Sequence, residues 1–200
     1  WQDVATGKRE WRWKNLPTPR PLYGLDSLAA RPDAPVVICE GEKAADAAAK
    51  LLPNHVAVCW PNGAEAVGAA DFTPLAGRYC LIWPDHDQPG QAAAEAVSKV
   101  LHKVGAAGVA CVAVETFQRL GAGVQDGKPV LIEGGELYEG DDAFDLSARG
   151  WTAEHFALLE AQGGWIVGTG LPEPEPDAGT SDTSKAPETA MPAPASQKTG

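Results

Sequence analysis

The stretch Val36-Val-Ile-Cys-Glu-Gly-Glu-Lys43 decides the fold, because a short apolar run passes directly into an acidic, glycine-containing helix start. Three later runs, Val56–Trp60, Tyr79–Trp83 and Val109–Val114, have the same apolar character. Short continuous apolar runs are typical of strands that are buried on both faces of a sheet. The sequence therefore predicts a central sheet of about four strands, of which Val36–Cys39 is the first.

Helical patterns separate these runs. Glu42–Leu52 is rich in alanine and other good helix formers, and Gln91–Val104 repeats apolar residues at helical spacing. Strands that alternate with helices favour a mostly parallel sheet joined by right-handed crossovers. We therefore expect an α/β fold. One more helix is predicted at Thr152–Gln162, begun by Thr152 as N-cap, and a hairpin or an irregular acidic loop at 129–145.

The chain divides into three parts. Residues 1–33 are rich in proline and tryptophan, and the alternation at Glu10–Lys14 predicts a strand at the end of an upstream β-rich, basic segment. A linker with one short helix at 21–30 follows. Residues 34–165 hold the predicted domain. Residues 166–200 are mostly Pro, Ala, Ser, Thr and Glu, which predicts a disordered tail because little apolar surface is available for burial.

The charge of the chain is unevenly distributed. Acidic residues outnumber basic ones 27 to 16, a net charge of −11, which disfavours binding to phosphate backbones. Residues 1–20 nevertheless carry a local net charge of +3, whereas residues 133–145 hold six acidic residues and no basic one. Such a cluster is compatible with a solvated loop or with a metal site. Because no membrane-spanning run or secretory signal is present, we expect a cytoplasmic protein without membrane contacts.

Neither cysteine nor histidine suggests a metal site. The four cysteines each stand alone in or beside an apolar run, at Cys39, Cys59, Cys80 and Cys111. Zinc sites need paired ligands at short spacing, so we expect no zinc and four buried, reduced side chains. The histidines are interpreted as a spacer or hydrogen-bond partner at His86 and as ordinary surface or helix residues at His55, His102 and His155.

Acidic side chains follow two of the predicted strands at the point where each strand ends. Glu40 comes directly after the first strand, and Asp85 and Asp87 follow the third. Because ligands collect at the carboxyl edge of such a sheet, we expect these carboxylates to converge there. Mg²⁺ (or Mn²⁺) would relieve their mutual repulsion through the oxygen ligands that it prefers. The pattern predicts a metal site that makes or cleaves phosphodiesters, while each acid taken singly is also compatible with a solvated turn.

Small and polar residues beside these acids suit a phosphate ligand. Glycine lets a backbone come close to a ligand, which is the expected role of Gly41, Gly63 and Gly90. Asn62 belongs to the same turn as Gly63 and is included in this phosphate-binding set. Lys43 is either a phosphate contact or a solvated side chain in the first turn of a helix.

Three stretches together resemble a known family: Val36–Asp46, Asn62–Gly63 and Leu81–Gly90. They look like the TOPRIM domain of primases, type IA and type II topoisomerases and OLD-type nucleases. This resemblance covers about residues 34–148 and implies a Rossmann-like fold. More narrowly, Arg20–Leu25 and Asp142-Ala-Phe-Asp-Leu146 are similar to primases and primase–helicase proteins of phages, plasmids and related mobile elements.

The resemblance implies an activity and a set of site residues. Glu40 corresponds to the acid of the first motif, Asp85 and Asp87 to the metal-binding pair, and Asp142 and Asp145 to a further acidic pair. The implied reaction is Mg²⁺-dependent nucleotidyl transfer, in which nucleoside triphosphates are joined into an RNA primer on single-stranded DNA. The implied partner is a replicative helicase on the same chain or on another. Weak nucleic-acid contacts are assigned to Arg12, Trp13, Lys14 and Arg20.

The sequence also departs from the family pattern. Many bacterial primases carry a second acid where this chain has Ala44, and they hold the template with upstream zinc and basic modules. Two alternatives stay open: the chain is active by itself, or it is catalytically incomplete without upstream modules. We expect most template binding to be located upstream or in a partner. A TOPRIM-type nuclease and a non-catalytic nucleic-acid or helicase-binding module remain the alternatives.

Overall fold

A computed structural model describes residues 16–168. The predicted strand at Glu10–Lys14, with the candidate contacts Arg12, Trp13 and Lys14, lies outside the described residues, as does most of the predicted tail. Within residues 16–168, no helix combines the length and the apolar character that crossing a membrane requires.

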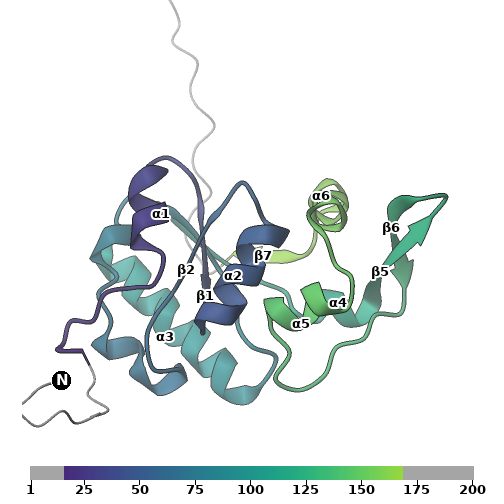
Figure 1. The fold of residues 1–200 in the computed structure, drawn as a ribbon. Coiled ribbons are helices and arrows are strands. Elements are labelled where there is room, and N and C mark those ends of the chain that lie inside the picture. Colours follow the sequence, from purple (N-terminus) through teal and green to yellow (C-terminus); the bar gives the residue numbers. More distant parts are fainter. Residues whose placement is uncertain (1–15, 169–200) are drawn as a thin grey trace, which may run out of the picture.

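A five-stranded sheet in the order β2-β1-β3-β4-β7 forms the centre of the fold (Figure 1). The strands are β1 (Val36–Cys39), β2 (Val56–Cys59), β3 (Tyr79–Ile82), β4 (Gly108–Val112) and β7 (Ile166–Gly168). The first four are parallel to their neighbours, whereas β7 is antiparallel to β4. The predicted α/β class and mostly parallel sheet are confirmed. The fifth strand was not predicted, because it starts in the range assigned to the tail and all three of its residues are exposed.

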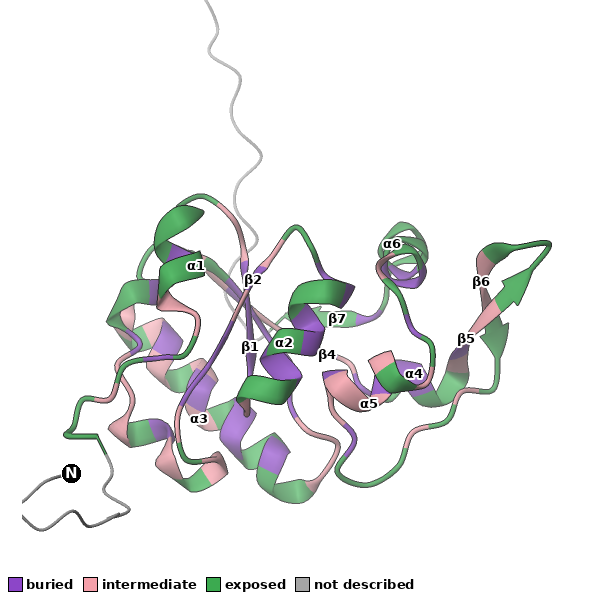
Figure 2. Ribbon diagram, viewed as in Figure 1, coloured by how far each residue is buried: buried purple, intermediate pink, exposed green. Residues whose placement is uncertain are grey.

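Helices cover both faces of the sheet, and Figure 2 shows the buried strands between them. Alternate residues of each strand point to opposite faces, so Val37 and Cys39 pack on one side and Val36 and Ile38 on the other. The first side carries α2 (Glu42–Leu51), α4 (Thr116–Arg119), α5 (Ala143–Ala148) and α6 (Ala153–Gln162). The second side carries α1 (Leu25–Ala30), α3 (Gln88–Val104) and the 3-10 helices η1 (Ala64–Ala69) and η2 (Thr73–Leu75).

Two predictions about buried side chains need adjustment. Cys39, Cys59 and Cys80 are buried and unpaired as expected, but Cys111 is only half-buried. His155 is not an ordinary surface or helix histidine, because it is 2% exposed and bonded at both ring nitrogens. Its Nδ1 accepts from the backbone N–H of Thr152 at 3.2 Å, and its Nε2 lies 2.9 Å from the Gly123 carbonyl oxygen, which it can bond as a donor. His155 thereby ties the start of α6 to the neighbouring hairpin.

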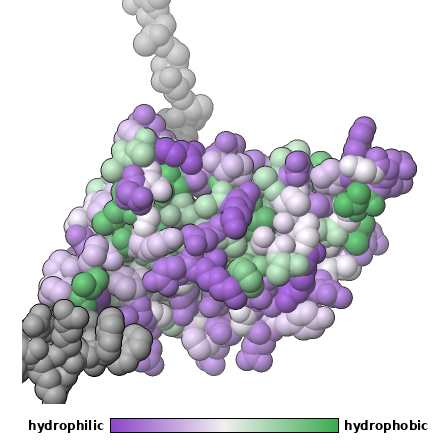
Figure 3. Space-filling model, viewed as in Figure 1, coloured by the Kyte–Doolittle hydropathy of each residue, from purple (hydrophilic) through white to green (hydrophobic). Residues whose placement is uncertain are grey.

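That hairpin consists of β5 (Leu120–Gln125) and β6 (Lys128–Glu133), so it begins earlier in the chain than the predicted range 129–145. Asp126 and Gly127 both have positive φ angles, as a two-residue hairpin turn requires. The hairpin projects from the body of the protein in Figure 1. Figure 3 shows hydrophobic surface at this end of the molecule, where Val124 is 73% and Ile132 47% exposed.

The segment before α1 is strapped to the edge of the sheet. The Tyr23 N–H donates to the Cys59 carbonyl at 2.9 Å, and Arg20 exchanges backbone hydrogen bonds with Ala69 and Asp71. Gly24 then turns the chain into α1 with a φ of 85°. A Cβ atom at Gly24 would lie 2.6 Å from the Ala57 carbonyl oxygen, so the strap approaches β2 closely.

We expect Gly24→Ala to lower the free energy of unfolding by about 3 kcal/mol, because a left-handed backbone and a backbone clash are both imposed. Gly77→Ala is the matched control: Gly77 has a φ of 71° but no atom within 4 Å of the added Cβ. It should cost only about 1 kcal/mol. Urea denaturation measures both, and equal losses would show that the contact between Gly24 and β2 contributes nothing.

Candidate functional site

The candidate site lies where the connections of the sheet diverge. From β1 the chain runs through α2 to β2 on one side, and from β3 it runs through α3 to β4 on the other. β1 and β3 are adjacent and parallel. Such a switch point is where open α/β sheets bind ligands, beyond the carboxyl ends of the strands. Glu40 directly follows β1, and Asp85 follows β3 after Trp83 and Pro84, so the structure places both acids at this point.

Glu40 is held by a turn that follows β2. Asn62 and Gly63 both have positive φ angles, 74° and 72°, and this turn directs the N–H of Ala64 toward the site. The Ala64 N–H donates to Glu40 Oε1 at 2.9 Å. Burial and the nearby Asp87 raise the pKa of Glu40, and the Ala64 hydrogen bond offsets part of that rise. Asn62 and Gly63 therefore position a carboxylate here.

Asp87 is the N-cap of α3. Its carboxylate accepts the Gly90 N–H at 2.6 Å, so α3 begins at Gln88 and not at the predicted Gln91. A Cβ atom at Gly90 would lie 2.5 Å from the Asp85 carbonyl oxygen. Gly90 therefore lets the helix start pack against the Asp85 loop, a packing role that the sequence did not predict.

Asp142 and Asp145 form a capping box at the start of α5. Asp142 Oδ1 accepts the N–H groups of Phe144 at 2.6 Å and Asp145 at 3.2 Å, while Asp145 Oδ2 accepts the Asp142 N–H at 3.2 Å. Burial raises the pKa of Asp142, the two backbone hydrogen bonds lower it, and the neighbouring Asp145 raises it, with a net rise. Asp142 and Asp145 thus cap the start of α5, and both lie close enough to Asp85 to raise its pKa.

Two backbone hydrogen bonds join the loop that carries Asp85 to the loop that carries Asp142. The His86 N–H donates to the Asp141 carbonyl at 2.8 Å, and the Gly140 N–H donates to the His86 carbonyl at 2.9 Å. His86 is therefore a structural link through its backbone. The link brings Asp142 near the carboxyl edge of the sheet, although Asp142 is distant from Asp85 in sequence.

Of the five carboxylates of the site, that of Asp85 has the most strongly shifted pKa. Its pKa rises from 3.8 to about 7, first through burial and then through Glu40, Asp142, Asp87 and Asp145 in that order. No hydrogen bond from a described residue offsets these effects on its pKa. Five carboxylates thus share one region, and the other four add to the effect of burial in raising the pKa of Asp85.

The predicted Mg²⁺ centre is not preassembled from these side chains. Within residues 16–168 no three or more His, Cys, Asp or Glu side chains are grouped closely enough to hold one ion. Glu40, Asp87 and Asp142 instead accept backbone N–H groups. The donor chemistry nevertheless suits Mg²⁺, because carboxylate oxygens are its preferred ligands and their charge here is uncompensated. Metal binding would require the carboxylates to shift from amide donors toward the ion.

The basic candidates have separate surroundings. Lys43 Nζ lies 3.4 Å from the centroid of the Phe144 ring, a cation–π contact that joins α2 to α5, which lie side by side in Figure 1. Arg20 donates from its guanidinium to the Leu16 carbonyl at 3.2 Å. Neither contact was predicted, and neither side chain is directed to an acid of the site by a hydrogen bond.

Gly41 has the open space that its predicted role would require. It is the N-cap of α2, it has no side-chain cap, and a Cβ atom added there would meet nothing within 4 Å. The ten-residue helix therefore presents an open N-terminus directly beside Glu40. An open helix N-terminus favours phosphate, because its N–H groups and its dipole are both directed at the ligand.

Sequence reasoning missed Asp141 and Arg149, which form a partly buried ion pair next to Asp142. It also missed the amide of Ala64, for which the Asn62–Gly63 turn was the available signal. Comparison with protein-family models, with curated proteins and with solved structures gives no match. The geometry and chemistry of the chain itself are therefore the basis for a function.

The pKa of Asp85 makes a prediction about stability. The folded chain keeps this proton up to about 7, whereas an ordinary aspartate releases it near 3.8. Because the folded state binds more protons in that range, the stabilisation is complete at low pH and is lost as the pH rises through about 7. Asp85→Asn lacks this titration, so its melting temperature should rise relative to that of the parent between about pH 4 and pH 8. A constant difference in thermal melts followed by circular dichroism would contradict the shift.

Proposed function

We propose that this chain is a TOPRIM-type catalytic domain of a primase, which joins nucleoside triphosphates into RNA primers on single-stranded DNA with Mg²⁺ or Mn²⁺. The observation that supports this best is the acidic switch point, where Asp85 has a pKa of about 7 beside Glu40, Asp87 and Asp142. Perturbed acids gathered at a topological switch point are typical of functional sites. Their residue types and order match the TOPRIM pattern noted in the sequence.

Glu40, Asp85 and Asp87 are the residues that would hold the metal, with Asp142 and Asp145 in reach of the same region. A bound Mg²⁺ would neutralise these carboxylates and polarise the phosphoryl oxygens of a nucleotide. As the pH rises through about 7, Asp85 would ionise and could then serve as a metal ligand. We therefore expect activity to rise with pH through the neutral range.

The open N-terminus of α2 is the proposed phosphate subsite. Gly41 leaves space above the backbone, and Glu40 lies one residue before it. The amides of the first turn of α2 would bind phosphate oxygens without any side-chain cation, while Lys43 stays over Phe144. This arrangement agrees with a site that recognises the triphosphate through backbone and metal together.

The charge of the chain indicates where template DNA could bind. The chain as a whole carries a net charge of −11, so template DNA has little to bind over most of its surface. Arg20 is the described basic residue of the N-terminal segment, and its backbone is strapped to η1. We propose that template binding involves the basic segment of residues 1–20 together with other modules or a helicase.

A primer-synthesis assay tests the proposal. The chain is incubated with single-stranded DNA, labelled nucleoside triphosphates and Mg²⁺ or Mn²⁺, in parallel with calorimetric titration of Mn²⁺. Short labelled RNA products are expected. Degraded DNA without RNA products would indicate a TOPRIM-type nuclease, and DNA or helicase binding without either reaction would indicate a non-catalytic module. Absence of Mn²⁺ binding would overturn the catalytic proposal itself.

A further inference from the structure

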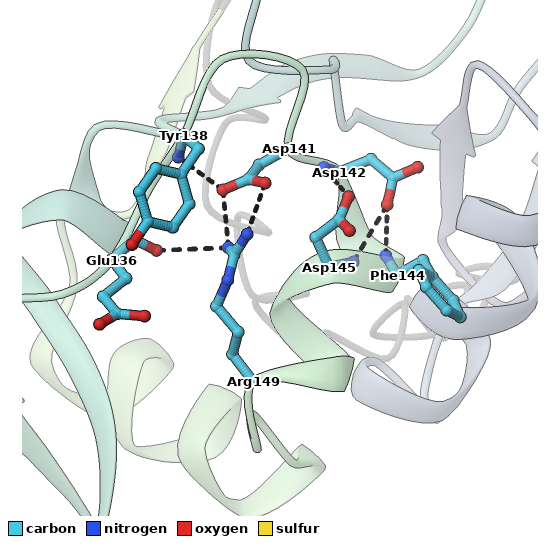
Figure 4. A network of polar contacts seen from close by, with 7 residues as sticks. All are labelled: Glu136, Tyr138, Asp141, Asp142, Phe144, Asp145 and Arg149. Carbon is cyan, nitrogen blue, oxygen red and sulfur yellow. Dashed lines mark hydrogen bonds and ion pairs between the residues drawn. The ribbon is translucent and has the colours of Figure 1, made fainter.

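A partly buried ion pair lies beside Asp142 and Asp145, and Figure 4 shows it from close by. Arg149 donates from Nη1 to Asp141 Oδ2 and from Nη2 to Asp141 Oδ1, both at 2.6 Å. The Asp141 side chain is 8% exposed and that of Arg149 is 26% exposed. Two parallel charge-assisted hydrogen bonds of this kind fix both distance and orientation.

Further contacts make the pair part of a network. The Tyr138 N–H donates to Asp141 Oδ2 at 2.6 Å, and the Arg149 guanidinium lies 4.9 Å from the centroid of the Tyr138 ring. Arg149 also reaches the Glu136 carbonyl at 3.4 Å. Burial by itself raises the pKa of Asp141, but the Arg149 and Tyr138 hydrogen bonds outweigh it, so the net pKa is lowered. The network therefore stabilises Asp141 as a carboxylate.

The network fixes both ends of the structure that carries Asp142. On one side, Asp141 accepts the His86 N–H through its own carbonyl, which anchors it to the Asp85 loop. On the other side, Arg149 is the C-cap of α5, and its backbone N–H donates to the Asp145 carbonyl at 3.0 Å. The ion pair thus connects the residue before Asp142 to the far end of the helix that Asp142 begins.

We propose that Arg149 is a positioning residue: through Asp141 it clamps the 134–142 loop against the Asp85 loop and sets the separation of Asp142 from Asp85. The side-chain hydrogen bonds of Arg149 go to Asp141 and to the Glu136 carbonyl, and none goes to the five described carboxylates of the site. The charge of Asp145 adds a weaker effect on the pKa of Arg149, so the main route of its influence is through Asp141. The inference rests on the proposed function for its consequence in catalysis. The clamp itself is a claim about the two loops and is measurable without any activity.

An ion pair with a purely structural role would lower the stability of the whole fold and leave metal affinity unchanged. A positioning role makes a different set of predictions. Loss of the clamp should loosen the His86 and Gly140 hydrogen bonds and weaken metal binding, while the rate at saturating metal stays close to that of the parent. Removing Arg149 would leave the buried Asp141 carboxylate without its charged partner and would also destabilise the fold, so stability must be recorded separately.

The variants are Arg149→Met, which keeps the aliphatic stem, Arg149→Lys, which keeps the charge, and Asp141→Asn. Arg119→Met is the control, because Arg119 is an exposed arginine at the end of α4. Hydrogen exchange of the His86 and Gly140 amides, Mn²⁺ calorimetry and the Mg²⁺ dependence of primer synthesis are measured for each, beside thermal melts.

In Arg149→Met we expect both amides to exchange faster and the Kd for Mn²⁺ to rise about tenfold, the usual effect of losing a residue that orients metal ligands. Arg149→Lys should recover part of this, and Asp141→Asn combined with Arg149→Met should lose little more than either alone, because both act through one contact.

Unchanged hydrogen exchange at the His86 and Gly140 amides overturns the proposed clamp. If Arg149→Met does not fold, Arg149→Lys and Asp141→Asn give the same decision. If the parent binds no Mn²⁺, the proposed function fails while the exchange data still test the clamp.

Discussion

Asp85→Asn is expected to abolish primer synthesis, lowering the rate by about a thousandfold or more. Asparagine keeps the shape of the side chain but removes the negative charge that the proposed metal site requires. We expect a large loss because Asp85 is partly buried among Glu40, Asp142 and Asp87, where the proposed metal would be held. The measurement is the yield of labelled primer at pH 8 under saturating Mg²⁺.

A loss of activity in Asp85→Asn is informative only if the variant folds. No hydrogen bond from a described residue to the Asp85 carboxylate is lost, and a repulsion is removed, so the variant should melt at or above the temperature of the parent. Asp126→Asn, at the exposed tip of the β5–β6 hairpin, is the matched control and should retain full activity. Undiminished primer synthesis in folded Asp85→Asn would refute the assignment of the site.

Gly90→Ala is expected to lower the free energy of unfolding by about 2–3 kcal/mol and primer synthesis by about a hundredfold. The added Cβ would lie 2.5 Å from the Asp85 carbonyl oxygen and 3.0 Å from Asp87 Oδ1. Relief of the overlap must move the loop that carries both acids, since the carbonyl belongs to the backbone. Displacements of about 1 Å at reacting groups are enough for a rate loss of this size.

Gly68→Ala is the control for Gly90→Ala, because it adds the same methyl group where no close contact exists. Gly68 lies in a short helix, has no positive φ, and leaves nothing within 4 Å of an added Cβ. It should be as stable and as active as the parent. Chemical denaturation and the primer assay are applied to both variants. A Gly90→Ala protein with the stability of the parent would mean that the close contact between α3 and the Asp85 loop is not rigid.

The sheet could be predicted because its signal is local. Each of the runs that begin at Val36, Val56 and Tyr79 is short, apolar and followed by a turn, and each is a strand in the structure. The placement of Glu40 and Asp85 at one edge follows from parallel strands, whose carboxyl ends lie together. β7 carries no such signal, since its three residues are exposed and it gains order by pairing with β4.

The hydrogen bonds of two of the acids follow from helix N-cap patterns in the sequence. Asp87 before Gln88-Pro89 and Asp142 three residues before Asp145 are N-cap patterns, and these were visible in the sequence as helix starts. Interpretation of these carboxylates as metal ligands alone overlooked them. The pairing of Arg149 with Asp141 was beyond reach, because it depends on how the loop before α5 folds over the Asp85 loop.

Three of the acids have a second task, which bears on how natural selection acts on them. Asp87 begins α3, Asp142 begins α5, and Glu40 holds the first amide of η1. A descendant without the proposed activity would still need these residues in order to fold, so their persistence in an evolving lineage would say little about chemistry. Asp85 has no comparable task among the described residues. Its replacement in a natural variant would therefore be the informative event, marking a lineage in which the fold has outlived the proposed reaction.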